Sequence, residues 1–599
     1  MRTGTRKKEE DERSRAMPPP TFTNPPRAGQ RKKLYPHVLD LNRFSIKELY
    51  NRELSIRAAS VKFRELPNWT EKLKNRSFVT NWLRQRQQDD FEDYKDVQDP
   101  YLKPFVWGRD DVTMWFNELA AYKHYVRKLQ KQGLKIEPDT EAVWRGDGLV
   151  EEEVRRKLID AATLLESIPE AEKLWRESQD SGPVVLDLVD PSMWPIVYQR
   201  TATADGIPLY GPSHTNDDDL RASNPNYCWL PSEFEVSEDG KSTKIASYVN
   251  NLASPRDEMV VVPILEKIFT AFVPLFNHVL AETERQLWTS SRCIDPSPWK
   301  SRVNDGMIVA SKENCIKASE KLLDEMENSG QISDTFEGIG DFANRRPKGY
   351  ESMFPIKNSI QLIADAIWKP PMASKLNRLE GKMAKVVVSM VNIMLSPENP
   401  EYKAEEWRLH GFRSERIIAT GVYYYAQKNI NETHLALRRR SFGKSTCAPR
   451  EIESVRTKEN RAIVYPNFYE HRIPNFTLVD KTKPGYSKML IFHYCDPCQL
   501  HNLPTTEQIH PQQPQVLEDR LRHSKLGTLP EEVFSQILSY LSISMISREE
   551  AQEYRAELIQ WGRDWVHDGD GYYSEHERDH YFGVDPNGYG FAYSSEDDD

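Results

Sequence analysis

The feature that most constrains this chain is a series of four apolar, β-branched and aromatic segments after Gly381, separated by hairpin signals. The segments are KVVVSMVNIML (385–395), ERIIATGVYYY (415–425), RAIVYPNF (461–468) and SKMLIFHY (487–494). The clearest turn signal is Pro484-Gly485, a dipeptide that is typical of tight turns. Several antiparallel strands flanked by helices predict an α+β fold with a double-stranded β-helix (jelly-roll) core that is wrapped by helices.

Helical periodicity dominates the chain before residue 180. One apolar stripe runs through residues 112–133 and ends at Gly133; its members are Val112, Trp115, Phe116, Leu119, Tyr122, Val126 and Leu129. EEEVRRKLIDAATLLESI (151–168) predicts a second helix that ends before Pro169. VVVPILEKIFTAFVPLFNHVLAETERQLW (260–288) predicts a long apolar helix that is kinked or interrupted at Pro274.

Short β-branched segments precede that long helix, and residues 228–252 predict a hairpin that turns at Asp239-Gly240. These patterns divide the chain into five expected parts. They are a disordered, basic, Pro-rich head (1–33), a helical N-terminal region (34–180), a jelly-roll core with inserted helices (181–500), C-terminal helices (501–563) and a disordered acidic tail (564–599).

Charge is unevenly placed along the chain, whose net charge is −10. Residues 1–33 carry ten Arg or Lys against four acids, and residues 564–599 carry eleven acids against Arg578. The remainder is close to neutral for its size, which argues against a nucleic-acid-binding core. The basic head is either a solvated tail or a nuclear localisation signal, and the two charged termini are candidate contacts for a protein partner.

Other bulk properties indicate a reducing compartment and no membrane. The sequence lacks a run of about 18 apolar residues, so we expect no membrane span. The charged N-terminus lacks the apolar core of a secretory signal, and six cysteines in 599 residues are too few for a disulfide framework. We therefore expect a cytoplasmic protein, with the nucleus as the alternative.

A 2-oxoglutarate/Fe(II) oxygenase needs a His, a carboxylate two residues later and a distal His, with a cation beyond them for the cosubstrate. Five segments of the chain carry a family resemblance: PVVLDLVDPSMWPIVYQRT, CWLPSEFEV, ERIIATGVYYYAQKNI, YPNFYEHRIPNF and DKTKPGYSKML. Through these and similar segments the chain resembles a large fungal family of uncharacterised proteins, domain of unknown function 4246, which is regarded as related to such oxygenases. The resemblance extends from about Leu34 to Trp561 and implies an oxygenase-like fold.

Three of the four functional positions implied by the resemblance are replaced. Family members usually read W-H-x-E-G where this chain has Arg408 in place of the first ligand and His410 in place of the carboxylate. His471 matches the distal ligand, and Ser487 stands where the family has the cosubstrate arginine. Lys488, next along the chain, is expected to face the opposite side of its strand.

Arg408 is the substitution with the largest cost for a metal. A guanidinium stays charged and offers only donors. About 4 Å from a divalent ion, at an effective dielectric near 20, it contributes roughly 8 kcal/mol of repulsion. We therefore predict a degenerate oxygenase site, no cofactor and a non-catalytic binding or scaffold role. The alternative is a dioxygenase that holds Fe(II) through His410 and His471 and uses 2-oxoglutarate.

Arg408 has two further interpretations. Because Arg408 and His410 are two apart on an expected strand, both side chains should share one face. Arg408 is then a built-in cation in an old pocket that takes a small anionic molecule, with His410 and His471 as donors. Otherwise it pairs with Glu405 or Glu406 and the pocket is filled.

Two smaller signals complete the sequence. Cys495 and Cys498 have the spacing of redox pairs and half zinc sites, with His493 or His501 as further zinc ligands, although no second such pair occurs. LGTLPEEVFSQILSYL (526–541) resembles the opening helix of an F-box, which predicts an adaptor role; an amphipathic packing helix is the simpler interpretation.

Overall fold

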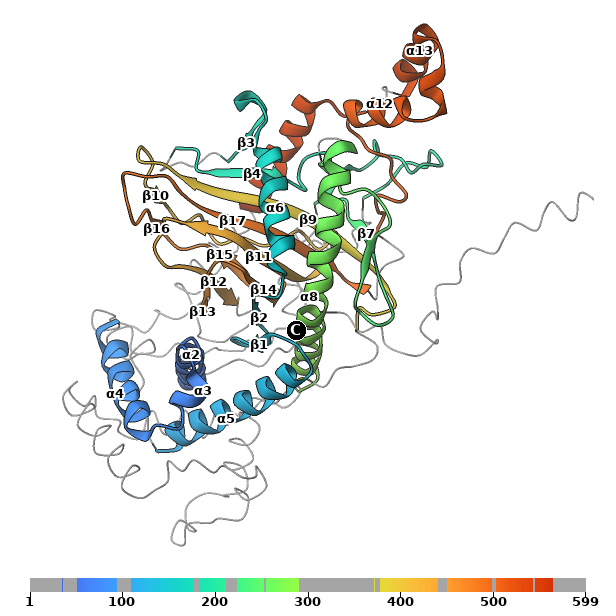
Figure 1. Cartoon of the computed structure of the whole chain (residues 1–599). Coiled ribbons are helices and arrows are strands. Elements are labelled where there is room, and N and C mark those ends of the chain that lie inside the picture. The colour runs from blue at the N-terminus through green and yellow to red at the C-terminus, as the bar shows by residue number, and fades with distance from the viewer. Residues whose placement is uncertain are drawn as a thin grey trace, which may run out of the picture. The chain divides into compact units, whose positions relative to one another are not determined.

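The computed structural model combines helices with a large antiparallel sheet (Figure 1). It describes residues 35, 51–93, 109–176, 182–211, 224–252, 255–289, 371, 378–439, 450–497, 503–541 and 545–563. The predictions for residues 1–33, for the tail 564–599 and for Cys498 and His501 lie outside the described residues.

Eight α-helices in the described residues have these bounds: α2 (Asn51–Arg64), α3 (Trp69–Lys72), α4 (Arg76–Asp93), α5 (Arg109–Lys131), α6 (Glu152–Glu166), α8 (Pro255–Thr289), α12 (Pro514–Arg522) and α13 (Glu531–Leu541). A further helix covers residues 548–563. Five of the seven members of the stripe predicted for α5 are buried, Phe116 is half-buried, and the side chain of Val112 lies outside the described residues; the buried members are Trp115, Leu119, Tyr122, Val126 and Leu129. Gly133 follows it in the left-handed region, at a φ of 79°.

The main sheet has ten strands, and its neighbouring strands are antiparallel. Its order is β1 (Ile136–Pro138), β2 (Trp144–Asp147), β14 (Arg461–Pro466), β11 (Ile417–Lys428), β17 (Gly485–Cys495), β9 (Met383–Leu395), β4 (Val185–Val189) and β3 (Leu174–Trp175), with β7 (Ser232–Val236) on β9 and β8 (Thr243–Ile245) on β7. The hairpin predicted around Gly240 is confirmed as β7 and β8.

Three smaller sheets complete the strands. They are β13 (Arg450–Thr457), β12 (Thr433–Arg439) and β15 (Glu470–Arg472) in that order, β10 (Glu401–Tyr402) with β16 (Phe476–Thr477), and β5 (Ile196–Val197) with β6 (Tyr227–Cys228). The four strands predicted after Gly381 are present and antiparallel, but the turn at Pro484-Gly485 leads from β16 into β17 and does not join two neighbours of one sheet. β17 instead lies between β9 and β11.

One face of the main sheet packs against α8, which lies beside α6 over the strands (Figure 1). Phe269 and Phe272 of α8 contact Phe492 of β17, with ring centroids 5.2 and 5.5 Å apart. The sequence left open whether this helix is interrupted at Pro274, and the structure has one helix through Pro263 and Pro274.

The helix α8 is also long and apolar enough to cross a membrane. An 18-residue window within Asp257–Glu284 reaches a mean hydropathy of 1.9, although Glu266 and Lys267 interrupt its run of apolar residues. Half of that window is buried inside the protein, and the buried phenylalanines pack on the sheet. A core helix has the same composition, so α8 is weak evidence for a membrane span.

The opposite face of the main sheet packs against the sheet β13-β12-β15 through a shared apolar core. Val391, Val422 and Met489 come from the main sheet, whereas Leu435 and Val455 come from the smaller one. The inner face of β17 therefore looks into the space between the two sheets, which is where the predicted site residues have to be sought.

A buried network of charges connects α2 to the edge of the main sheet. The Arg145 guanidinium, 1% exposed, contacts Glu65 and lies 3.1 Å from both Glu137 and Asp139. Arg461 lies 2.8 Å from Glu65 as well. Since these residues come from the end of α2, from β1, β2 and β14, the network fixes the helix against the sheet.

Candidate functional site

The backbones of Arg408 and His471 pair with one another. The Arg408 N–H donates to the His471 carbonyl and the His471 N–H donates to the Arg408 carbonyl, both over 2.9 Å. His471 belongs to β15, whereas Arg408 forms an isolated bridge and not part of a longer strand. The strand expected over residues 408–410 is therefore wrong, because the chain bends after Arg408 and Gly411 adopts a φ of 70°.

Three imidazole rings meet at this bridge. The ring of His410 stacks on that of His471, with centroids 3.8 Å apart and 15° between the planes. The ring of His493, from the inner face of β17, lies 4.5 Å from that of His410 at 52°. The structure thus brings Arg408, His410 and His471 together and adds His493 to them.

Hydroxyl groups lie within hydrogen-bond distance of several ring nitrogens. The Nε2 atom of His410 lies 2.7 Å from the Tyr465 hydroxyl. His493 has the Ser389 hydroxyl 3.2 Å from its Nε2 and the Thr420 hydroxyl 3.3 Å from its Nδ1. The Nδ1 atom of His471 is buried and has no hydrogen-bond partner among the residues that the structure describes.

The three imidazoles are held in the neutral form. Burial lowers the pKa of His471 to about 3, and the Arg408 charge adds to that effect. Burial also lowers the pKa of His493 to about 3. The pKa of His410 falls well below its usual range for the same reason, with the neighbouring imidazoles opposing a further charge.

The charge of Arg408 is paired. Its Nη2 atom lies 2.7 Å from a carboxylate oxygen of Glu405, three residues earlier in the chain. Burial lowers the pKa of Arg408 while Glu405 opposes that shift, and a guanidinium remains charged in any case. The structure contains the ion pair with Glu405 that the second interpretation of Arg408 requires.

More arginines surround the bridge, and they too have acidic partners. Arg176 lies 2.8 and 2.6 Å from the two carboxylate oxygens of Asp187. Arg555 reaches Asp187 over 2.7 Å and Asp190 over 2.5 Å. Arg176 contributes to the low pKa of His471. The surroundings of the histidines are therefore rich in charge, but the charges are largely compensated within the protein.

The arrangement of His410 and His471 does not fit a shared metal ion. The lone pair of an imidazole nitrogen lies in the ring plane, and a metal bond to it is about 2.0–2.1 Å long. Two nearly parallel rings 3.8 Å apart keep their lone pairs in separate, nearly parallel planes, so the lone pairs do not meet at one ion. Among the described residues, no set of three His, Cys, Asp or Glu side chains is placed to hold one ion.

Ser487 lies away from the three histidines, at the other end of β17. Six residues separate it from His493 along a regular strand, or about 20 Å at ~3.3 Å per residue. Met489 and Ile491 occupy the same inner face between them and pack into the apolar core. The Ser487 hydroxyl instead accepts a hydrogen bond from Gln427 over 3.0 Å.

Lys488 points to the other side of β17, as expected. Its ammonium group lies 2.5 Å from the carboxylate of Glu166 on α6. It is 7% exposed and contacts none of the three histidines. Lys488 therefore does not replace the missing arginine at this position.

Sequence reasoning missed His493 as a neighbour of His410 and considered it only as a zinc ligand with the cysteine pair. The available signal was its position in SKMLIFHY, where the alternation of the strand places it on the same face as Met489 and Ile491. A single imidazole on the apolar inner face of a strand indicates polar groups in the interior. The strand pattern cannot identify those groups, because they come from distant segments of the chain.

Cys495 has the properties of a structural thiol. It is buried and free, and burial raises its pKa to about 12. Since the thiolate is the reactive and metal-binding form, this environment suppresses both kinds of chemistry. Cys228, also buried and free, lies in the same apolar cluster, and burial raises its pKa as well.

Comparison with known proteins places the chain in a family. Residues 109–520 match the family described as Protein of unknown function (DUF4246). No curated protein matches the chain.

Solved structures give only weak likenesses. A structure described as the selenomethionine-labelled Fe(II)/α-ketoglutarate-dependent dioxygenase TqaL is 9% identical, with a TM-score of 0.23, and the match covers 68% of this chain and 97% of that one. The structure of IDO from Bacillus thuringiensis is 9% identical, with a TM-score of 0.15, over 24% of this chain and 56% of that one. Hazelnut vicilin is 12% identical, with a TM-score of 0.11, over 23% and 39%.

At such scores these likenesses carry no argument about fold or function. The family match is different in kind, since it spans 109–520 of a chain of 599 residues. The chain belongs to the family of proteins of unknown function named DUF4246.

Proposed function

We propose that this protein is a non-catalytic member of its family, in which an oxygenase-like fold is kept as a binding scaffold. The stacked pair His410 and His471 carries the proposal. The side chains at the expected ligand positions hold each other face to face, and Arg408 beside them repels a cation.

The fold we propose is a double-stranded β-helix. Its support is the packing of the ten-stranded sheet on β13-β12-β15 around one apolar core, with turns such as that before Gly485 passing from one sheet to another. The three histidines lie between these sheets, where a jelly-roll protein carries its site.

Loss of the cosubstrate anchor supports the same proposal. A 2-oxoglutarate molecule bound near His471 would need a cation within reach of its far carboxylate. Ser487 has no charge, lies about 20 Å along β17 from His493, and is separated from it by core residues. Lys488 is already paired with Glu166.

The experiment is a metal and turnover assay on purified full-length protein under anaerobic conditions. We expect substoichiometric Fe(II) by elemental analysis and no succinate from 2-oxoglutarate after oxygen is admitted. Turnover at an ordinary enzymatic rate would end the proposal.

A double substitution tests whether the site positions are correctly assigned. Arg408→His with His410→Glu restores the family's His and carboxylate beside His471, so we expect Fe(II) binding to appear. The matched control is Arg408→Gln with His410→Glu, which removes the repelling charge without supplying the second imidazole. If the double substitution gains no more iron than the control, the assignment is wrong.

One observation favours a second candidate, a metal-dependent oxidoreductase that uses His410 and His471. The buried Nδ1 of His471 lacks a partner, and an unpaired buried nitrogen costs about 1–3 kcal/mol unless a ligand satisfies it. That candidate requires the two rings to rotate apart. It predicts stoichiometric metal that is lost in His471→Ala and retained in the control His434→Ala.

The same unpaired nitrogen supports a small anionic ligand that bears a protonated group or carries a bridging water to His471. Because Glu405 already compensates Arg408, a carboxylate ligand would have to replace Glu405. We therefore expect dicarboxylates to raise the melting temperature of Glu405→Gln more than that of the unsubstituted protein. An equal response in both would argue against a ligand at Arg408.

A further inference from the structure

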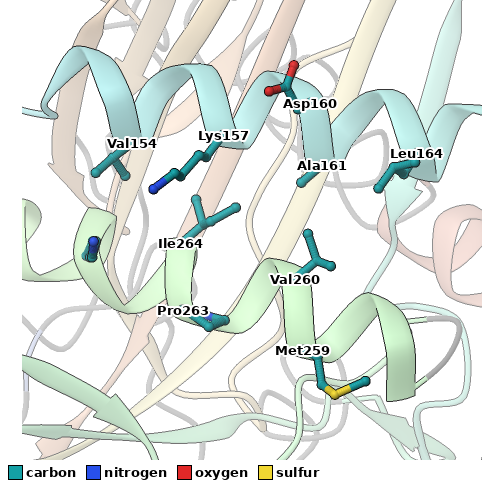
Figure 2. Close-up of a pocket in the computed structure, with 10 residues that line it drawn as sticks. Val154, Lys157, Asp160, Ala161, Leu164, Met259, Val260, Pro263 and Ile264 are labelled. Carbon is teal, nitrogen blue, oxygen red and sulfur yellow. The ribbon is translucent and has the colours of Figure 1, made fainter.

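An apolar groove lies between α6 and α8 on the outer side of the main sheet. Its volume is about 330 Å³, and the residues that line it include Ala161, Leu164, Met259, Val260 and Ile264. Figure 2 shows Ala161 and Leu164 of α6 and Val260 and Ile264 of α8 projecting between the two helices, whereas Met259 is directed away from α6. Met259 is 73% exposed and Leu164 is 56% exposed, so two large apolar side chains at this groove are in contact with water.

The groove has a polarity along its length. Lys157 stands toward one end, whereas Leu164, Val260 and Met259 gather at the other (Figure 2). Lys267 also lines the groove and interacts with Glu153, the partner of Lys157, which places both lysines at the same end. These lysines can pair with a new acidic group at little cost in free energy, because an exposed ion pair such as Lys157–Glu153 contributes ~0–1 kcal/mol.

The helix α13 presents the complementary pattern. Val533 and Tyr540 are 43% and 67% exposed, and Ile537 between them is half-buried. Their spacing of i, i+4 and i+7 puts the three on one face, which is the pattern of a helix that docks in a groove. Phe534 is the buried residue of the helix among those whose side chains are described. The amphipathic packing helix expected here therefore leaves an apolar face uncovered.

The groove between α6 and α8 and the exposed face of α13 are complementary in charge and similar in length. Glu531 and Glu532 begin α13 directly before Val533, and Glu531 forms an exposed ion pair with Arg522 over 3.0 Å that contributes little to stability. From Val533 to Tyr540 the helix rises about 10.5 Å, the same as from Lys157 to Leu164 on α6. With the two glutamates at the lysine end, the apolar face of α13 would run toward Leu164 and Met259.

We propose that the groove between α6 and α8 receives α13 of a second copy of this chain. In a two-fold symmetric dimer each chain would supply one helix and one groove, so the contact is made twice. Making the contact twice doubles the buried area, which matters because stable interfaces bury more than about 1,000 Å². This inference goes beyond the proposed function and is independent of the histidine cluster.

The test uses full-length protein in two charge-reversed forms. Variant A carries Lys157→Glu and Lys267→Glu, and variant B carries Glu531→Lys and Glu532→Lys. Each alone places like charges at the contact, so we expect its dimer dissociation constant to rise about tenfold or more over the unsubstituted protein by sedimentation velocity. An equimolar mixture of A and B regains opposite charges at both contacts, and we expect dimers to return.

Apolar substitutions complete the test. Met259→Asp in the groove or Tyr540→Asp on α13 should each weaken the dimer. Val479→Asp, a site 69% exposed and outside the groove, should not. A monomeric unsubstituted protein at about 100 µM would overturn the proposal, as would dimers that persist in A and B. Variants that lose dimerisation without rescue on mixing would overturn it too.

Discussion

The imidazole rings of His410 and His471 lie face to face, 3.8 Å apart and 15° from parallel. The backbone of His471 is paired with that of Arg408, so the guanidinium and the stacked rings belong to one local unit. A site that seats a divalent ion needs lone pairs that converge and anions nearby. The lone pairs of this unit lie in separate, nearly parallel planes beside a guanidinium that is paired with Glu405, and its imidazoles are neutral and half-buried.

The buried imidazole of His493 should make stability depend on pH. Its pKa in the folded protein is about 3, whereas an unfolded histidine titrates near 6.5. Between these values the unfolded chain binds more protons than the folded protein. The contribution of the neutral His493 imidazole to stability is therefore complete above about pH 6.5 and is lost as the pH falls toward 3. The slope for one such group is at most ~1.4 kcal/mol per pH unit.

His493→Gln isolates that contribution, because the amide keeps polar contacts to Ser389 and Thr420 but does not titrate. Burial raises the pKa of Glu137 and of Glu415 to about 7, which gives the opposite pH dependence in this range. Those groups are common to both proteins, so they cancel in the comparison. Between pH 7 and 5 the melting temperature of the unsubstituted protein should fall more steeply than that of His493→Gln. The exposed His124→Gln should follow the unsubstituted protein, and parallel curves for all three would refute the prediction.

Arg408→Gln should raise the pKa of His471. The positive guanidinium is the largest effect after burial that lowers it, so its removal should bring the value up from about 3. For a neighbouring charge in a partly buried site, the rise is on the order of one to two pH units. Histidine resonances in selectively ¹³C-labelled protein would report it. Lys403→Gln, at an exposed position on the same segment, serves as the control and should leave the His471 titration where it is.

How far the fold could be predicted depends on the range of the interactions that decide it. The helix α5 followed from the stripe Trp115, Leu119, Tyr122 and Val126, since a 3.6-residue period is a local property. The antiparallel strands followed from β-branched runs for the same reason. That β17 lies between β9 and β11 could not follow, because the order of strands is set by contacts between residues as far apart in the chain as Val386 and Tyr494.

The same distinction between local and long-range contacts applies to the candidate site. The chemistry of Arg408 was readable from its side chain alone, and its pairing with Glu405 is a contact between residues three apart. The arrival of His493 beside His410 depends on β17, some eighty residues away. Ser487 was assigned to the site by its place in a motif, yet the regular rise of β17 carries it to the far end of the strand.

Gly421 is required by the close approach of α8 to β11. A Cβ atom built at this position would lie 2.8 and 2.9 Å from ring carbons of Phe272 and 3.0 Å from Phe276. Gly421→Ala should therefore displace those rings, and overpacking of this kind costs about 1–3 kcal/mol. A lower midpoint in chemical denaturation would measure it. In the control Gly562→Ala the added methyl meets no atom within 4 Å, so the midpoint should be unchanged or slightly higher, since alanine favours the helix.

Arg145 should be the most sensitive residue at the junction of α2 with the sheet. Its guanidinium is 1% exposed and faces the carboxylates of Glu65, Glu137 and Asp139. Arg145→Met keeps much of the volume but leaves these acids without that partner. Breaking a buried ion pair from one side costs about 3–5 kcal/mol, because the remaining charge stays out of water. The loss should be largest above pH 7, where Glu137 is ionised, and smaller near pH 5, where its raised pKa of about 7 leaves it protonated. Lys74→Ala is the control, since its pair with Glu71 is exposed and contributes little.

Protease digestion within residues 51–93 of the two variants would show whether α2 detaches first. Equal digestion of Arg145→Met and Lys74→Ala would contradict a role for the network in holding that helix.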